Sequence, residues 1–137
     1  MWGFFNVYLG VTNQTSVIIY MASTVQEYNF TVHQGAEVNV TLNLTESNGS
    51  ASDLTDYAVR GIVKHRYSDD SALLDLVPTI LAPATSGSIS ISIPSTPTSQ
   101  LPVGQFVYDI EKYPLNNPEA VSKVLKGFFN VHPETTT

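Results

Sequence analysis

The sequence contains no cysteine among its 137 residues. This absence excludes a disulfide framework, a thiolate metal site and a thiol nucleophile together. Because small secreted animal domains often carry at least one disulfide, the composition better suits a reducing cytosol, or a virus particle assembled there. A chain of this length can bury an adequate core without cross-links, and we expect one domain.

Basic residues are also scarce. Six Lys and Arg stand against 12 Asp and Glu, which gives a formal net charge of -6 at pH 7. The summed field of such a protein repels phosphate, and six cations are too few to form a stripe that releases counterions. We therefore expect no nucleic-acid partner.

No long hydrophobic run is present either. Residues 1–20 are apolar, but polar side chains interrupt them from Asn6 onward, and they contain no Lys or Arg. They lack the length of a membrane span and the basic start of a signal peptide, so we expect no membrane partner. Because Met21-Ala22-Ser23 reads as a second translation start, residues 1–20 are either an appended arm or the product of a start assigned too far upstream.

The residues that are frequent favour β-structure. Val, Ile, Thr, Tyr, Phe and Ser dominate, only 13% of residues are charged, and eight Pro and eight Gly interrupt the chain. From Tyr28 onward apolar residues recur mostly with period two, without convincing helical periodicity, which predicts strands. The expected fold is an all-β, immunoglobulin-like β-sandwich of about seven antiparallel strands with an N-terminal extended arm.

Turn residues and prolines set the approximate limits of these strands. The run 73–81 is broken by Pro78 and is expected at a sheet edge, and 94–102 is too rich in proline for a central strand. The seven expected strands cover residues 28–33, 38–45, 57–67, 73–81, 87–93, 106–110 and 121–131.

Alternation also predicts which side chains face the core. In the strand from 57, the inward set is Tyr57, Val59, Gly61 and Val63, and the outward set is Arg60, Ile62, Lys64 and Arg66. In the last strand, the inward set is Leu125, Gly127, Phe129 and Val131, and the outward set is Lys126, Phe128 and Asn130.

Four short motifs follow one another along the chain. They are Asp-Leu-Thr-Asp-Tyr at 53–57, the strand 87–93, Leu-Pro-Val-Gly-Gln-Phe-Val-Tyr-Asp at 101–109, and Lys-Gly-Phe-Phe-Asn-Val at 126–131. Their order and spacing resemble a family of small immunoglobulin-like structural proteins of tailed bacteriophages, of the tail, baseplate, neck or head accessory type, often from marine and cyanobacterial phages. The resemblance covers roughly residues 25–133.

The resemblance implies an immunoglobulin-like fold, no catalytic activity, and a place in a virion assembled in the host cytoplasm. Its implied partners are other virion proteins, with a homo-oligomer or symmetric copies in the particle. The chain departs from a true immunoglobulin domain at Phe106, which lacks the hydroxyl of a tyrosine corner. Residues 1–20 have no counterpart in the family pattern.

The pentapeptide Gly-Phe-Phe-Asn-Val occurs at 3–7 and again at 127–131. An apolar arm that copies the last strand can pair with an exposed sheet edge of a neighbouring subunit. Alternatively, residues 1–11 pair within their own domain as an eighth strand, or the repeat is accidental. The candidate interface residues are the aromatic side chains of this arm, Trp2, Phe4, Phe5 and Tyr8.

We expect three segments along the chain. Residues 1–24 are an N-terminal arm or extra strand, residues 25–133 form the immunoglobulin-like sandwich, and residues 134–137 are a flexible tail.

No constellation of residues points to catalysis, a metal or a cofactor. His33, His65 and His132 stand singly, without a partner at the close spacing of a zinc pair. The acidic residues Asp69, Asp70 and Asp75 are not accompanied by the glycine-centred loop of a calcium site. No Gly-x-Ser-x-Gly elbow marks a nucleophilic serine. Asp109 and Glu111 lie on one exposed strand face, and not in a cleft as the paired carboxylates of a glycosidase would. We expect a protein that is not an enzyme.

The leading function is a structural subunit of a tailed-phage virion, in the capsid, neck, tail or baseplate. The alternative is a carbohydrate- or cell-surface-binding module that uses the end loops 47–56 and 113–119, where Tyr113, Asn116 and Asn117 can meet a sugar. Those loops offer only one candidate aromatic for a sugar platform. A secreted eukaryotic adhesion domain is a third reading, which the missing cysteines and signal peptide argue against.

Overall fold

The computed structural model describes residues 14–21 and 26–133, which contain ten strands and two very short helices. The strands are β1 (Gln14–Met21), β2 (Gln26–Glu27), β3 (Phe30–His33), β4 (Val38–Glu46), β5 (Tyr57–Lys64), β6 (Leu74–Asp75), β7 (Thr79–Ile80), β8 (Ser88–Ile93), β9 (Gly104–Pro114) and β10 (Ser122–His132). The helices are the 3₁₀ turn η1 (Ala84–Ser86) and α1 (Ser95–Ser99).

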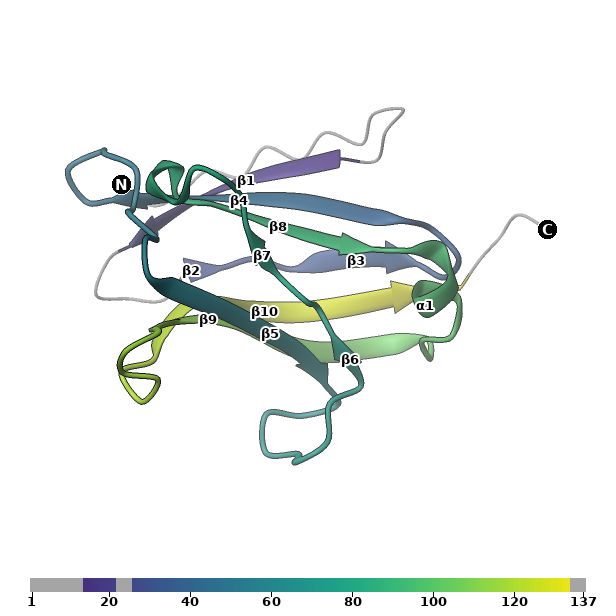
Figure 1. The fold of residues 1–137 in the computed structure, drawn as a ribbon. Helices are drawn as coiled ribbons and strands as arrows, with labels where there is room; N and C mark the ends of the chain where they lie inside the picture. The colour runs from purple at the N-terminus through teal and green to yellow at the C-terminus, as the bar shows by residue number, and fades with distance from the viewer. Residues whose placement is uncertain (1–13, 22–25, 134–137) are drawn as a thin grey trace.

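The strands form two sheets that pack face to face (Figure 1). Sheet A has the order β1-β4-β8-β7, and sheet B has the order β2-β10-β9-β5-β6, with β3 also paired to β10. Immunoglobulin domains place strands A, B, E and D in one sheet and G, F and C in the other. The orders β4-β8-β7 and β10-β9-β5 reproduce B-E-D and G-F-C, so the expected all-β sandwich is confirmed.

Two features of the expected pairing are wrong. β1 runs parallel to β4, and both β2 and β3 run parallel to β10, so the strands are not all antiparallel. The described residues also hold more strands than the seven expected. β1 falls within residues 1–24, where an extra strand was one of two alternatives, β2 was not foreseen, and the run 73–81 forms two strands. Side-chain alternation reports which face of a strand is buried, but neither its neighbour nor its direction.

The edge position predicted for residues 73–81 is confirmed. Pro78 separates β6, at the edge of sheet B, from β7, at the edge of sheet A, so this segment crosses from one sheet to the other. The connection 94–102 contains helix α1, which was not expected. Pro94 precedes this helix, and Pro97 lies in its first turn, where proline is tolerated. The Thr98 hydroxyl is buried and donates to the Ala36 carbonyl oxygen at 2.8 Å.

The core lies between the sheets and follows the predicted alternation. Leu125, Gly127, Phe129 and Val131 of β10 are buried, as predicted. Tyr108 of β9 is buried, and its hydroxyl donates to the Tyr28 carbonyl oxygen at 2.6 Å. The Phe30 ring packs edge-on against Tyr108, with 4.9 Å between centroids, and so ties β3 to the core.

Gly127 allows the segment before β3 to approach β10 closely. A Cβ atom at this position would lie 2.0 Å from the Tyr28 carbonyl oxygen, which is closer than any real contact. The Tyr28 amide donates to the Lys126 carbonyl oxygen at 2.9 Å, and the Phe128 amide donates to the Asn29 side chain at 2.9 Å. Any other residue in place of Gly127 would push these strands apart.

The first described segment belongs to the sandwich. β1 pairs with β4 along its whole length, and Ile19 is fully buried in the core. Residues 1–13, 22–25 and 134–137 lie outside the described part of the chain, so the three-segment division and the flexible tail stay predictions. Within the described residues, no helix is long and apolar enough to cross a membrane.

Candidate interaction surface

The predicted interface residues Trp2, Phe4, Phe5 and Tyr8 lie outside the described residues, so their role stays a prediction. The described structure instead brings charged, aliphatic and aromatic side chains together on the outer face of sheet B, where they are exposed or partly exposed. Three adjacent strands contribute to this face: Arg60, Ile62 and Lys64 from β5, Val107, Asp109 and Glu111 from β9, and Lys123, Lys126 and Phe128 from β10.

Strand register arranges these side chains in rows. Lys64, Val107 and Phe128 are direct neighbours across the three strands, and Ile62, Asp109 and Lys126 form the next row. Cross-strand neighbours are close enough for their side chains to interact. The predicted outward set of β5 is confirmed for Arg60, Ile62 and Lys64, but Arg66 follows the end of the strand.

A β-bulge brings Lys123 to this face. The register between β9 and β10 shifts between Lys123 and Leu125, so that Val124 and Leu125 are both buried. Strict alternation from Leu125 would turn Lys123 into the core, whereas the extra residue of the bulge turns it outward. Sequence reasoning missed this position, although the consecutive apolar pair Val124-Leu125 was a usable signal.

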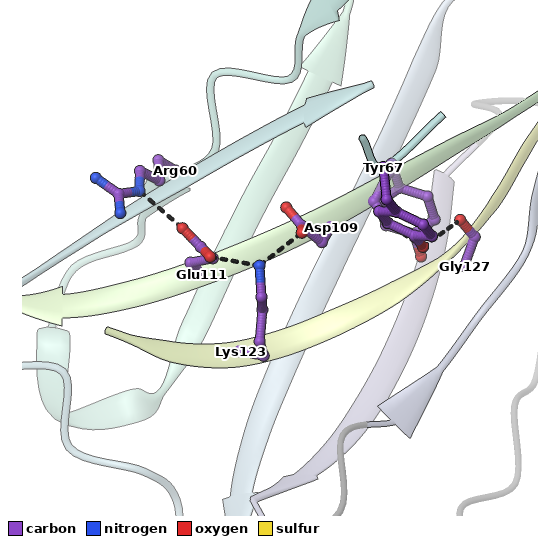
Figure 2. Close-up of polar contacts among 7 residues, drawn as sticks. Arg60, Tyr67, Asp109, Glu111, Lys123 and Gly127 are labelled. Carbon is purple, nitrogen blue, oxygen red and sulfur yellow. Dashed lines mark hydrogen bonds and ion pairs between the residues drawn. The ribbon is translucent and has the colours of Figure 1, made fainter. Parts of the chain in front are cut away.

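Lys123 is the centre of a chain of ion pairs (Figure 2). Its ammonium group lies 2.6 Å from an Asp109 carboxylate oxygen and also contacts Glu111, whose other oxygen lies 2.9 Å from the Arg60 guanidinium. Partial burial opposes the charge of Glu111, but hydrogen bonds from Lys123 and Arg60 outweigh it and lower the pKa of Glu111. Burial likewise opposes the charge of Lys123, but the two carboxylates raise its pKa.

Tyr67 folds back over the same face from the loop after β5. Its hydroxyl lies 3.2 Å from the Tyr108 carbonyl oxygen and 3.4 Å from that of Gly127 (Figure 2). Burial, followed by the negative charge of Asp109, raises the pKa of the Tyr67 phenol. A shallow hollow lies beside the ring, lined by Ile62, Lys64, Tyr67, Val107, Tyr108 and Asp109.

The face therefore combines exposed apolar groups with charge. Phe128 is 43% exposed and Tyr67 is 52% exposed, although both are large aromatic side chains. Asp109 and Glu111 are held by ion pairs, Lys126 lies in the same row as Asp109, and Lys64 lies in the row beside it. Exposed aromatic residues next to polar and charged groups are typical of protein contact surfaces.

The end loops of the alternative function are neighbours in the structure. The Leu115 amide donates to the Asp56 carbonyl oxygen at 2.9 Å, which joins loops 113–119 and 47–56. Tyr113 does not form an open platform, because the Arg60 guanidinium lies 4.9 Å above its ring. Asn116 and Asn117 are exposed in the turn that follows.

The remaining polar candidates take local roles. Asp75 accepts a hydrogen bond from the Val77 amide at 2.9 Å, and Asp69 lies 3.6 Å from Arg66. His65 packs against Phe106, with 5.1 Å between ring centroids. Across residues 14–21 and 26–133, no three His, Asp or Glu side chains group together in a way that could hold a metal ion.

Among the comparisons with known proteins, the likeness to a domain of a phage protein supports the fold. No protein-family model matches the chain, and no curated protein matches it. Among solved structures, it is similar to the N-terminal domain of phage TP901-1 ORF48, at 8% identity and a TM-score of 0.55, over 87% of this chain and 98% of that one. It is also similar to the cysteine protease inhibitor EhICP2 from Entamoeba histolytica, at 12% identity and a TM-score of 0.43, over 87% and 97% of the two chains.

Proposed function

We propose that the protein is a non-enzymatic structural subunit of a tailed-phage particle that acts through protein–protein contacts. The observation that carries the proposal is the likeness in fold to a domain of a phage protein, which extends over nearly the whole of both chains. The ordered motifs at 53–57, 87–93, 101–109 and 126–131 favour the same class of protein. Its partners would be other virion proteins, and its place would be the capsid, neck, tail or baseplate.

The outer face of sheet B is the contact surface that the described geometry favours. Its side chains stand on three hydrogen-bonded strands of a sandwich, so the surface is formed before a partner arrives and little ordering is needed on binding. Phe128 and Tyr67 supply apolar area, and the paired charges around them give a partner polar groups to match.

The proposal is tested on purified particles of the phage that encodes this chain. Mass spectrometry should find the protein in gradient-purified virions at a fixed ratio to the major capsid protein, and a labelled antibody should place it at one site by electron microscopy. If the protein is abundant in the infected cell but missing from intact particles, the proposal fails.

The contact surface has its own test. Phe128→Asp should reduce incorporation into particles at least tenfold, because it replaces the exposed aromatic area of the face with an unmatched charge. Val103→Asp is the matched control, since Val103 is 54% exposed and lies outside this face. Equal incorporation of both variants would show that the contact surface lies elsewhere. The aromatic arm at residues 1–11 would then be the next surface to examine.

The sugar-binding alternative makes a different prediction. A glycan array should show specific binding that Tyr113→Ala abolishes and Phe128→Asp leaves intact. Such a result would replace the proposed function, whereas an array without binding would leave the structural role as the better account.

A further inference from the structure

Two histidines that lie near opposite ends of the chain stand side by side on neighbouring strands. His33 ends β3 and His132 ends β10, and the two residues are direct partners in the parallel ladder between these strands. Their ring centroids are 5.5 Å apart, and the ring planes are inclined by 34°. Both residues are exposed.

The backbone holds this pair in place. The Gln34 amide donates to the His132 carbonyl oxygen at 2.9 Å, and the Ala36 amide donates to the His33 carbonyl oxygen at 3.0 Å. The Gln34 side chain is turned away and donates to the Leu101 carbonyl oxygen at 2.7 Å. No hydrogen bond from another described residue occupies the ring nitrogens of His33 or His132, and each neutral imidazole keeps one nitrogen lone pair.

The spacing of the rings fits two ligands of one metal ion. A zinc-bound imidazole nitrogen lies about 2.0–2.1 Å from the ion, which puts the ring centre about 3.2 Å away. Two such rings at a tetrahedral angle have centres about 5.2 Å apart. The observed separation of 5.5 Å is close to this value, so the two rings are already at a spacing at which they can share one ion.

We propose that His33 and His132 form a chelating site for a borderline divalent transition-metal ion, such as Zn²⁺, Ni²⁺ or Cu²⁺, with water at the remaining coordination positions. Imidazole suits these ions, whereas Mg²⁺ and Ca²⁺ prefer oxygen ligands. The ion would link the edge strand β3 to β10, and because it binds the folded arrangement it would stabilise the fold. This inference does not depend on the proposed function.

Calorimetric titration of the full chain, without an affinity tag, with NiCl₂ and ZnCl₂ tests the site. We expect one ion per chain, affinity at least tenfold weaker in His33→Asn and in His132→Asn, and no binding of MgCl₂. His65→Asn is the matched control and should bind as the parent does, because His65 is exposed elsewhere, against Phe106. No saturable binding, one ion per two chains, or unchanged affinity in the His33→Asn/His132→Asn double variant would each overturn the proposal.

A second measurement guards against effects on folding. Ni²⁺ should raise the Tm of the parent and of His65→Asn by several degrees and leave the Tm of the double variant unchanged. Circular dichroism without metal should be the same for the parent and for every variant, since the substituted side chains are exposed. With Cu²⁺, electron paramagnetic resonance should report two nitrogen ligands, and a spectrum without nitrogen coupling would contradict the assignment.

Discussion

Gly127 shows how one residue governs the contact between two strands. The Tyr28 carbonyl oxygen occupies the space of its missing side chain, and on either side the Lys126 carbonyl and the Phe128 amide bind the segment before β3. The sequence placed Gly127 on the inward face, but nothing in the alternation indicated that a backbone would cross there. The requirement for glycine comes from a neighbour that lies far away along the chain.

Replacing Gly127 with alanine should therefore be costly. In Gly127→Ala the new methyl group must displace the Tyr28 backbone, and we expect a loss of about 3 kcal/mol in the free energy of unfolding. Lys126→Ala, at the exposed position before it, should change stability by less than about 0.5 kcal/mol. Urea unfolding of the two variants measures the difference, and equal stability would contradict the close approach.

The ion pairs around Lys123 predict a small dependence of stability on pH. Glu111 has a folded pKa below its ordinary value of 4.5, so its stabilising contribution is present above that value and is lost as the pH falls through the lower, folded pKa. Lys123 has a folded pKa above its ordinary 10.5, so its contribution is present below that value and is lost as the pH rises through the folded pKa. Because the groups are partly exposed, each contribution should stay under about 1 kcal/mol.

A double-mutant cycle measures this coupling. Glu111→Gln, Lys123→Gln and the double variant, compared by urea unfolding at pH 7, should give an interaction energy of about 0.5 kcal/mol. The coupling should shrink at acidic pH once Glu111 takes up a proton, and it should shrink in 1 M salt. A coupling that persists under both conditions would show that the interaction is not electrostatic.

At the scale of elements, β10 illustrates what alternation can and cannot predict. Its inward side chains after Leu125 were predicted correctly, because a half-buried strand leaves a clear period of two. The bulge at Val124 interrupts that period, and it decides that Lys123 joins Asp109 and Glu111 on the outer face. The ion-pair chain of the candidate surface thus depends on one irregular residue.

The bulge makes Val124 a core residue in a position where strict alternation expects an exposed one. Val124→Ala should lower the free energy of unfolding by about 1–3 kcal/mol, since the side chain is 1% exposed. Val121→Ala, at 36% exposure just before β10, should have an effect within about 0.5 kcal/mol. Equal effects of the two substitutions in chemical denaturation would refute the bulge.

On the scale of the whole molecule, the described part of the N-terminal region is divided between the two sheets. β1 lies in sheet A and delivers Ile19 to the core, and β2 and β3 lie in sheet B beside β10. A deletion that tests the predicted arm must therefore leave β1 intact, because a chain without residues 1–20 also loses a buried core side chain.

Two truncations separate assembly from folding. Without residues 1–13, the chain keeps every buried core residue that the structure describes, and light scattering should report a smaller assembly if the arm joins subunits. Without residues 1–21, the loss of Ile19 alone should cost about 2–5 kcal/mol, with a clear fall in Tm. An unchanged mass for the shorter deletion would exclude arm-driven self-association.

The sequence by itself determined the fold class, the inward residues and the break at Pro78. Apolar and polar residues alternate along each strand, and this alternation can be recognised without knowing which strands are neighbours. Only the tertiary structure decided that β1 pairs in parallel with β4 and that β3 pairs in parallel with β10. It also decided that Lys123 turns outward and that His33 lies beside His132. Those outcomes depend on backbone hydrogen bonds between distant segments. Such bonds use the same amide and carbonyl groups at every residue. The local pattern of side chains therefore does not indicate which strand pairs with which.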